Sequence, residues 1–231
     1  MTQQQQLDLI IVAIYLISVA YVLFQAINSV EDQTTISFNK GAVTKQIEEQ
    51  NLQDVIDVNV KFDGKYKYDN QPKELAVTVE NKSKTKAIEV DWDRSSIITG
   101  GRARRIIRLS QDKRIDLFQR QVFSMATPGL SLQEKVTAED LLKVNPDTGV
   151  FEVTGPIVDI AKMKKDAAGK KAGDKARTAY EDFASLKTTV KFAMRLVVRI
   201  YDLMGAESDR LHALTCDFEI KKVPWTDFLP K

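Results

Sequence analysis

Residues 190–200 read VKFAMRLVVRI, and this stretch decides the fold class. Apolar side chains occupy every second position from Val190 to Ile200, with basic residues between them. A loop at 205–210 returns the chain into Leu214–Ile220, which alternates in the same way. Because period-two alternation is typical of a strand with one buried face, the two stretches predict a long β-hairpin.

Shorter strands are predicted upstream of the hairpin. They are Ile56–Phe62, Leu75–Val79, Ile88–Trp92, Ile106–Leu109 and Val150–Val153. Polar or glycine-containing stretches such as Asn81–Lys86 and Gly100–Gly101 separate them and are typical of turns. Several short strands with such turns predict a mainly β fold, an antiparallel β-sandwich-like domain.

One or two short helices are expected beside the strands. Thr137 as N-cap, acids in the following turn and Lys143 at the end predict about two helical turns. Residues 41–54 place Val43, Ile47 and Leu52 on one side, which also favours a short helix.

The N-terminal region carries an uncharged run, Leu9–Val30, of 22 residues. A helix of this length extends about 33 Å, enough to cross the ~30 Å hydrocarbon core of a bilayer. A cleaved signal peptide would begin with basic residues, whereas Gln3–Gln6 precede this run. The sequence therefore predicts a transmembrane helix that is retained as a single-pass anchor.

The flanks of this run indicate an orientation. No Lys or Arg precedes it, while Lys40 and Lys45 follow it. Positive residues near a span stay on the cytoplasmic side, so the large domain is expected to be cytoplasmic. The lone Cys216 fits a reducing compartment without requiring one.

Polar side chains lie on one side of the predicted anchor. Those within its apolar part are Tyr15, Ser18, Tyr21 and Gln25. Interhelical hydrogen bonds hold spans together in lipid, so this side is a candidate face for a membrane partner. The alternative is that the polar side chains share one side by chance, since polar residues are expected at the ends of any membrane span.

The chain divides into four regions by pattern and composition. They are a tail and transmembrane helix at 1–30, a polar connector at 31–53, the β domain at 54–223 with a basic insertion at 162–178, and an aromatic C-terminal tail at 224–231.

The insertion concentrates positive charge. Residues 162–177 have a net charge of +5, while the whole chain has +2. The basic residues are Lys162, Lys164, Lys165, Lys170, Lys171, Lys175 and Arg177. They are candidates for contact with anionic lipid, and the alternative is a solvated or partly helical insertion. A nearly neutral chain argues against a nucleic-acid-binding protein.

The C-terminal tail contains Trp225, Phe228 and Leu229. Exposed aromatic residues of this kind would form a docking peptide, because aromatic anchors dominate interface energetics. The alternative is that the aromatic rings fold back onto the domain.

No catalytic signature emerges from the sequence. His212 and Cys216 are the only histidine and cysteine, and their spacing places both on the apolar side of a strand, which predicts a core position. Asp91 and Asp93 are expected to end a strand, and the arginines within 102–108 to pair with nearby acids, with phosphate binding as the minor alternative. No cofactor or metal site is predicted.

A resemblance to a known group rests on three stretches: Val79–Ser83, Val90–Ser96 and Gly101–Arg105. They resemble uncharacterised single-span, membrane-anchored β-domain proteins of cyanobacterial type. The resemblance covers about 30 residues, implies a plasma or thylakoid membrane location, and brings no catalytic residues.

Together these patterns predict a non-enzymatic accessory, scaffold or assembly factor of a larger membrane complex. Its expected partners are membrane lipids and other membrane protein subunits. The alternative is a periplasmic or lumenal ligand-binding or sensor domain tethered to the membrane. A third reading, a membrane-bound enzyme, would have to use carboxylates or arginines alone.

Overall fold

The predicted hairpin forms the centre of a large sheet in the computed structural model. The structure describes residues 3–109, 120–169, 173–203 and 210–228, and within the N-terminal helix it describes the side chains of residues 9–22, 24 and 25. Strand β11, Val190–Asp202, pairs with β12, Arg210–Lys222, from Val190 opposite Ile220 to Ile200 opposite Arg210. The hairpin is therefore confirmed, and it extends beyond the predicted ends.

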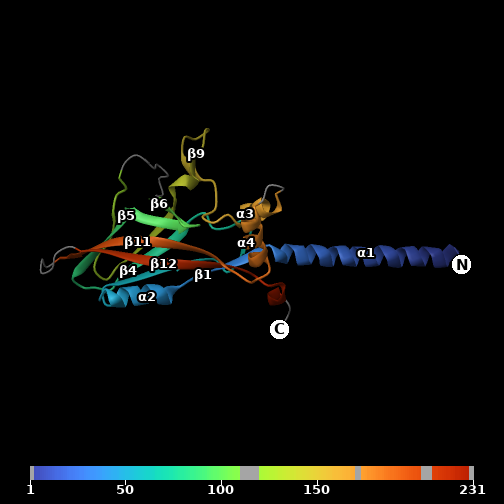
Figure 1. Ribbon diagram of the computed structural model, residues 1–231, viewed down its shortest axis with the longest axis horizontal. Helices are drawn as coiled ribbons and strands as arrows, with labels where there is room; N and C mark the ends of the chain where they lie inside the picture. The colour runs from blue at the N-terminus through green and yellow to red at the C-terminus, as the bar shows by residue number, and fades with distance from the viewer. Residues whose placement is uncertain (1–2, 110–119, 170–172, 204–209, 229–231) are drawn as a thin grey trace.

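Ten antiparallel strands form one sheet in the order β2-β4-β8-β6-β5-β11-β12-β1-β3, with β7 joined to β5. Their bounds are β1 Gln33–Phe38, β2 Ile56–Lys61, β3 Tyr66–Lys67, β4 Leu75–Asn81, β5 Lys86–Thr99, β6 Arg102–Arg108, β7 Ser124–Ala126 and β8 Ser131–Ala138. A separate small hairpin pairs β9, Leu142–Val144, with β10, Phe151–Val153. The mainly β, antiparallel class is thus confirmed (Figure 1).

The large sheet curls over its own core instead of forming two separate sheets. Phe218 of β12 stacks on Phe192 of β11 at 4.7 Å between ring centroids. Phe62, just after β2, meets the same ring edge-on at 5.4 Å, although β2 lies near the opposite end of the strand order. The two halves of the sheet therefore face each other as the layers of a sandwich do.

A bulge helps the sheet to bend. The pairing of β11 with β5 shifts register between Arg195 and Val197. There Ser95 Oγ accepts a hydrogen bond from Val197 N at 3.0 Å and donates one to the Asp91 carbonyl at 2.6 Å. Bulges increase local twist, so this point lets β5 turn from the hairpin toward β6.

Four α-helices occur within the described residues, more than the sequence predicted. They are α1 Gln3–Glu31, α2 Lys40–Glu49, α3 Ile160–Ala168 and α4 Asp174–Ala184, with 3₁₀ turns η1 Glu139–Leu141 and η2 Trp225–Phe228. Asn39 caps the start of helix α2, and its side chain accepts a hydrogen bond from Ala42 N at 3.2 Å. It buries Val43 and Ile47, as predicted for this stretch.

The region 31–53, predicted as a polar connector, contributes directly to the domain. Within it, β1 pairs with β12 on one side and β3 on the other. Helix α2 is held on β12 by Gln46, whose amide group bonds both the carbonyl and the N–H of Thr215, at 2.9 and 2.8 Å. Residues 31–53 are thus part of the sheet and its covering layer.

Two further local expectations are corrected. Thr137 does not cap a helix: it lies buried in β8, and its hydroxyl donates to the Lys73 carbonyl at 2.7 Å. Only the 3₁₀ turn η1 follows it. Strand β5 does not end at Asp93 but continues to Thr99, because residues 96–99 pair with β11 on one side and β6 on the other.

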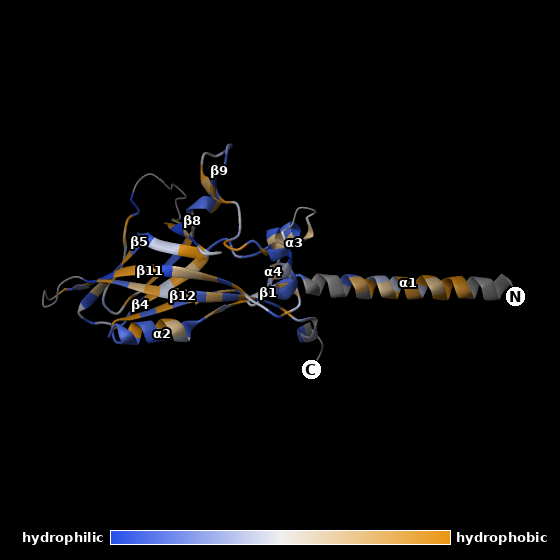
Figure 2. Ribbon diagram, in the orientation of Figure 1, coloured by the Kyte–Doolittle hydropathy of each residue, from blue (hydrophilic) through white to orange (hydrophobic). Residues whose placement is uncertain are grey.

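Helix α1 projects from one end of the domain, and its middle is mainly hydrophobic (Figure 2). Its large apolar side chains with a described position are 38 to 68% exposed, from Val19 to Ile17. Among the described residues, no helix is both long enough and apolar enough to cross a membrane. The predicted span stays a prediction.

Candidate functional site

A pocket opens where α1 enters the domain, between α3 and the chain around β3. Its volume is about 510 Å³. The polar side chains that line this α1–α3 pocket are Asp32, Lys67, Tyr68, Asp69, Lys164 and Lys165. Ala161 and Ala168 of α3 complete its wall.

Backbone hydrogen bonds fix the elements that surround the pocket. Tyr68 N donates to the Asp32 carbonyl at 2.9 Å, which holds β3 beside the end of α1. Helix α3 begins at Asp159, whose carboxylate accepts from Lys162 N at 2.7 Å. Side-chain capping of this kind satisfies an otherwise unpaired helix N–H, so α3 has a defined start and orientation.

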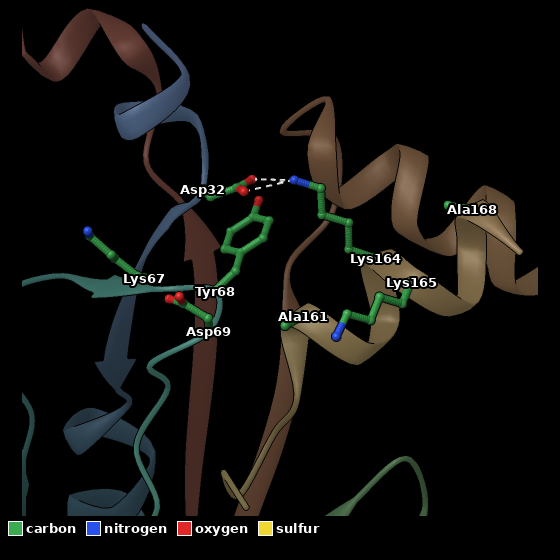
Figure 3. Close-up of a pocket in the computed structure, with 8 residues that line it drawn as sticks. All are labelled: Asp32, Lys67, Tyr68, Asp69, Ala161, Lys164, Lys165 and Ala168. Atoms are coloured by element: carbon green, nitrogen blue, oxygen red, sulfur yellow. Dashed lines mark hydrogen bonds and ion pairs between the residues drawn. The ribbon is translucent and has the colours of Figure 1, made fainter. Parts of the chain in front are cut away.

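An ion pair connects α3 to the end of α1. Lys164 Nζ lies 2.8 Å from each carboxylate oxygen of Asp32 and 5.7 Å from the centroid of the Tyr68 ring (Figure 3). Both charged side chains are nearly half exposed, so the pair contributes at most about 1 kcal/mol. Its effect is mainly to position the Lys164 amine over the buried tyrosine.

The remaining charges are arranged unequally about the pocket. Figure 3 shows Lys165 extending along α3 toward Ala161, while the amine of Lys67 and the carboxylate of Asp69 point away from α3. Among the residues that the structure describes, Lys165 forms no ion pair. The pocket is therefore lined by two ammonium groups from α3, and the Asp32 carboxylate pairs with one of them, that of Lys164.

The structure places five of the seven predicted lipid-contact residues. Lys162, Lys164 and Lys165 lie on α3, and Lys175 and Arg177 lie on α4, all exposed. Lys170 and Lys171 lie outside the described residues. The basic insertion is thus largely helical, and α3 packs against α4 beside the end of α1 (Figure 1).

All four residues of the candidate partner face lie exposed on α1. Gln25 Nε2 donates to the Tyr21 hydroxyl at 2.8 Å, and Ser18 Oγ donates to the Ile14 carbonyl at 2.8 Å. Tyr15 is 66% exposed. The structure therefore brings Tyr21 and Gln25 together, one helical turn apart, without describing what they face.

The predicted docking tail is described only in part. Trp225 and Phe228 lie in η2, which sits near α1, but their side chains are outside the described part of the chain. Leu229 lies outside it as well. The docking peptide and the alternative, in which the aromatic rings fold back onto the domain, therefore both stay predictions.

His212 and Cys216 are not equally buried. Cys216 is fully buried in the core as predicted, and burial raises the pKa of its thiol to about 12. His212 is half-buried near the start of β12, with Nδ1 2.8 Å from Oε1 of Gln50, the residue that follows α2. Burial, and then the charge of Arg210, lowers the pKa of His212. They do not form a nucleophile pair.

Arg104, Arg105 and Arg108 of β6 pair with acids, as predicted, whereas Arg102 has no ion pair among the described residues. Arg105 lies 2.7 Å from Asp93, and Arg108 lies 3.0 Å from Glu134. Burial opposes ionisation of Asp93, but hydrogen bonds from Arg105 and Gln121 outweigh it and lower the pKa of this carboxyl. The cluster joins β5 to β6 and the chain near β7, and these contacts give it a structural role.

Because the pKa of Asp93 is lowered in the folded chain, its stabilisation is present above the unfolded pKa of about 3.9 and disappears as the pH falls through the lower folded pKa. Asp93→Asn should therefore lower the free energy of unfolding by about 1–2 kcal/mol at neutral pH. The difference from the native chain should shrink toward about pH 3. Urea unfolding of both chains between neutral pH and about pH 3 measures this difference in the free energy of unfolding. A difference that grows on acidification would contradict the lowered pKa of Asp93.

Some pocket residues were not singled out by the sequence. The sequence placed Asp32 in the polar connector and indicated no element or role for Tyr68 and Asp69. The one local pattern near these residues is the alternation of basic and aromatic residues in Lys65-Tyr66-Lys67-Tyr68. The sequence does not indicate that this stretch lies next to α3, because the two segments come together only in the folded chain.

No family model, curated protein or solved structure matches the chain. The resemblance to single-span proteins of cyanobacterial type therefore stays a prediction.

Proposed function

We propose that the protein is a single-span membrane protein whose β domain acts, without catalysis, as an accessory, scaffold or assembly factor of a larger membrane complex. The observation that carries this proposal is the exposure of apolar side chains along α1. Its described apolar side chains are 38 to 68% exposed, and they continue around the helix for several turns. A contiguous apolar surface of this kind is rare on monomeric soluble proteins and marks contact with lipid or protein.

The length of the uncharged run supports a span. Counted over the full sequence, and not only over the residues with described side chains, the uncharged run Leu9–Val30 contains 22 residues, and a bilayer core requires about 20. A helix satisfies its own backbone hydrogen bonds, which is the condition for crossing lipid. The plasma or thylakoid membrane is the proposed location.

The charges near the end of α1 support a cytoplasmic domain. Lys40 and Lys45, the basis of the sequence prediction, lie in α2, and Lys40 is paired with Asp57 at 2.8 Å. Figure 1 shows α2 along the far part of the sheet and α3 beside the end of α1. Lys40 and Lys45 nevertheless stay within about 15 residues of Val30 along the chain, the range over which positive residues influence the orientation of a span.

The polar side of α1 is the proposed contact with another subunit. Tyr15, Ser18, Tyr21 and Gln25 would lie at membrane depth, where lipid cannot accept or donate their hydrogen bonds. Polar side chains in spans accordingly face protein, and model spans gain about 1–2 kcal/mol from such contacts.

Replacement of Tyr15, Ser18 and Gln25 together by leucine should release the protein from its complex. Loss of interhelical hydrogen bonds predicts a decrease of about tenfold or more in co-purified partner, while the chain stays in the membrane. Gentle detergent extraction of native-level protein, followed by native-size analysis and co-purification, measures both.

The matched control changes three residues on the opposite side of α1: Leu9→Ile, Leu16→Ile and Phe24→Leu. It should leave co-purification unchanged. Survival of co-purification in the triple leucine variant would exclude the polar side as the contact. Migration of the native protein as a free monomer would overturn the scaffold function itself.

A further inference from the structure

We propose that the α1–α3 pocket binds the phosphate headgroup of an anionic phospholipid from the membrane leaflet next to the domain. The inference rests on the proposed function, because it requires α1 to lie in the bilayer. It goes further, since it assigns the basic helix α3 a single bound lipid in place of diffuse attraction to a charged surface.

The position of the pocket suits a headgroup. Asp32 follows α1 directly and lines the pocket, so the cavity lies within about one helical turn of the end of the apolar run at Val30. Headgroups occupy the layer just outside the hydrocarbon core. A lipid beside α1 can therefore place its phosphate in the pocket while its acyl chains remain along the helix.

The chemistry of the lining suits an anion with an apolar neighbour. Lys165 lines the pocket from α3 and extends toward Ala161, and the Lys164 amine stands over the tyrosine ring (Figure 3). Asp32 offsets only one of these two charges. The methyl groups of Ala161 and Ala168 offer apolar contacts for the glycerol backbone.

The orientation of the other charged residues agrees with this assignment. Asp69, which would repel a phosphate, points away from α3, as does Lys67 (Figure 3). A lysine near an anionic surface contributes about fivefold to binding. Lys165, which forms no ion pair within the described part of the chain, is the residue that supplies this contribution.

The test uses the full chain in mild detergent with phosphatidylglycerol mixed into phosphatidylcholine, and native mass spectrometry counts the lipids retained. We expect one retained phosphatidylglycerol. Lys165→Gln should reduce retention about fivefold. Ala168→Phe, which fills the cavity and keeps every charge, should reduce it as well.

Lys175→Gln is the control, because it removes the same charge from exposed α4, outside the pocket. It should retain the lipid as the native chain does. Equal retention in Lys165→Gln and Lys175→Gln would overturn the pocket as the binding site and leave only surface attraction. Equal retention of both lipids by the native chain would overturn the preference for an anion.

A competition arm separates the lipid from a soluble phosphate. Millimolar inorganic phosphate should not displace phosphatidylglycerol, because it lacks the glycerol backbone and the tethering in the bilayer. Full displacement would overturn the lipid assignment. If the chain remains soluble after detergent removal, the proposed anchor fails; if it requires detergent but retains no lipid, only this inference fails.

Discussion

Phe218→Ala should lower the free energy of unfolding by about 3–5 kcal/mol, the usual loss for a buried phenylalanine. Phe218 is fully buried in β12 and touches three other rings: Phe192 at 4.7 Å, Phe62 at 5.4 Å and Phe38 at 5.5 Å. These rings come from both halves of the curled sheet. Removal of the central ring therefore leaves a cavity at the point where the halves meet, and rigid strands cannot close it.

Urea unfolding of the detergent-solubilised chain measures this loss. The control is Phe123→Ala, because Phe123 is 43% exposed and its replacement should cost less than about 1 kcal/mol.

Cys216 provides an independent readout: it is buried with a thiol pKa of about 12, and it lies two residues from Phe218 on the same side of β12. Thiol reagents should leave it unmodified in the native chain and modify it faster in Phe218→Ala. Equal stability of the two alanine variants would show that the sheet closes around other contacts.

The central hairpin was predictable because its signal is local. Alternation over Val190–Ile200 and Leu214–Ile220 fixes which side chains are buried, and a slip of one residue would expose all of them. The same reasoning located β2 and β4. Strand β1, Gln33–Phe38, gave no comparable signal, because Thr34 is its only fully buried residue and its place depends on pairing with β12.

The curl of the sheet and the pocket depend on contacts between distant segments. The bulge beside Val197 requires the hydroxyl of Ser95 from another strand, which no pattern in either strand reveals. The pocket likewise combines Asp32, Tyr68 and Lys165. Composition identified the basic residues of α3, but only the fold brings them next to α1.

Charge in the middle of α1 should abolish membrane retention. Ile17→Asp and Val22→Asp together place two acids at the centre of the run Leu9–Val30, on side chains that are 68% and 64% exposed. Each acid at the centre of a span costs about 2.5–3.5 kcal/mol, and two of them offset most of the favourable transfer of the apolar residues. Aspartate is preferable to lysine here, because acids have little influence on topology.

Fractionation after an alkaline carbonate wash measures retention, and protection of Cys216 from thiol reagents verifies that the released domain is folded. Gln4→Asp with Gln5→Asp is the matched control, because it adds the same charge to α1 before the apolar run begins. The control should remain in the membrane fraction, since its acids can lie in water beyond the headgroups.

Release of the central variant, Ile17→Asp with Val22→Asp, with Cys216 still protected would locate the anchor in α1 and separate it from the β domain. Retention of the central variant after the wash would require another membrane attachment, and α1 would then be a surface for a protein partner.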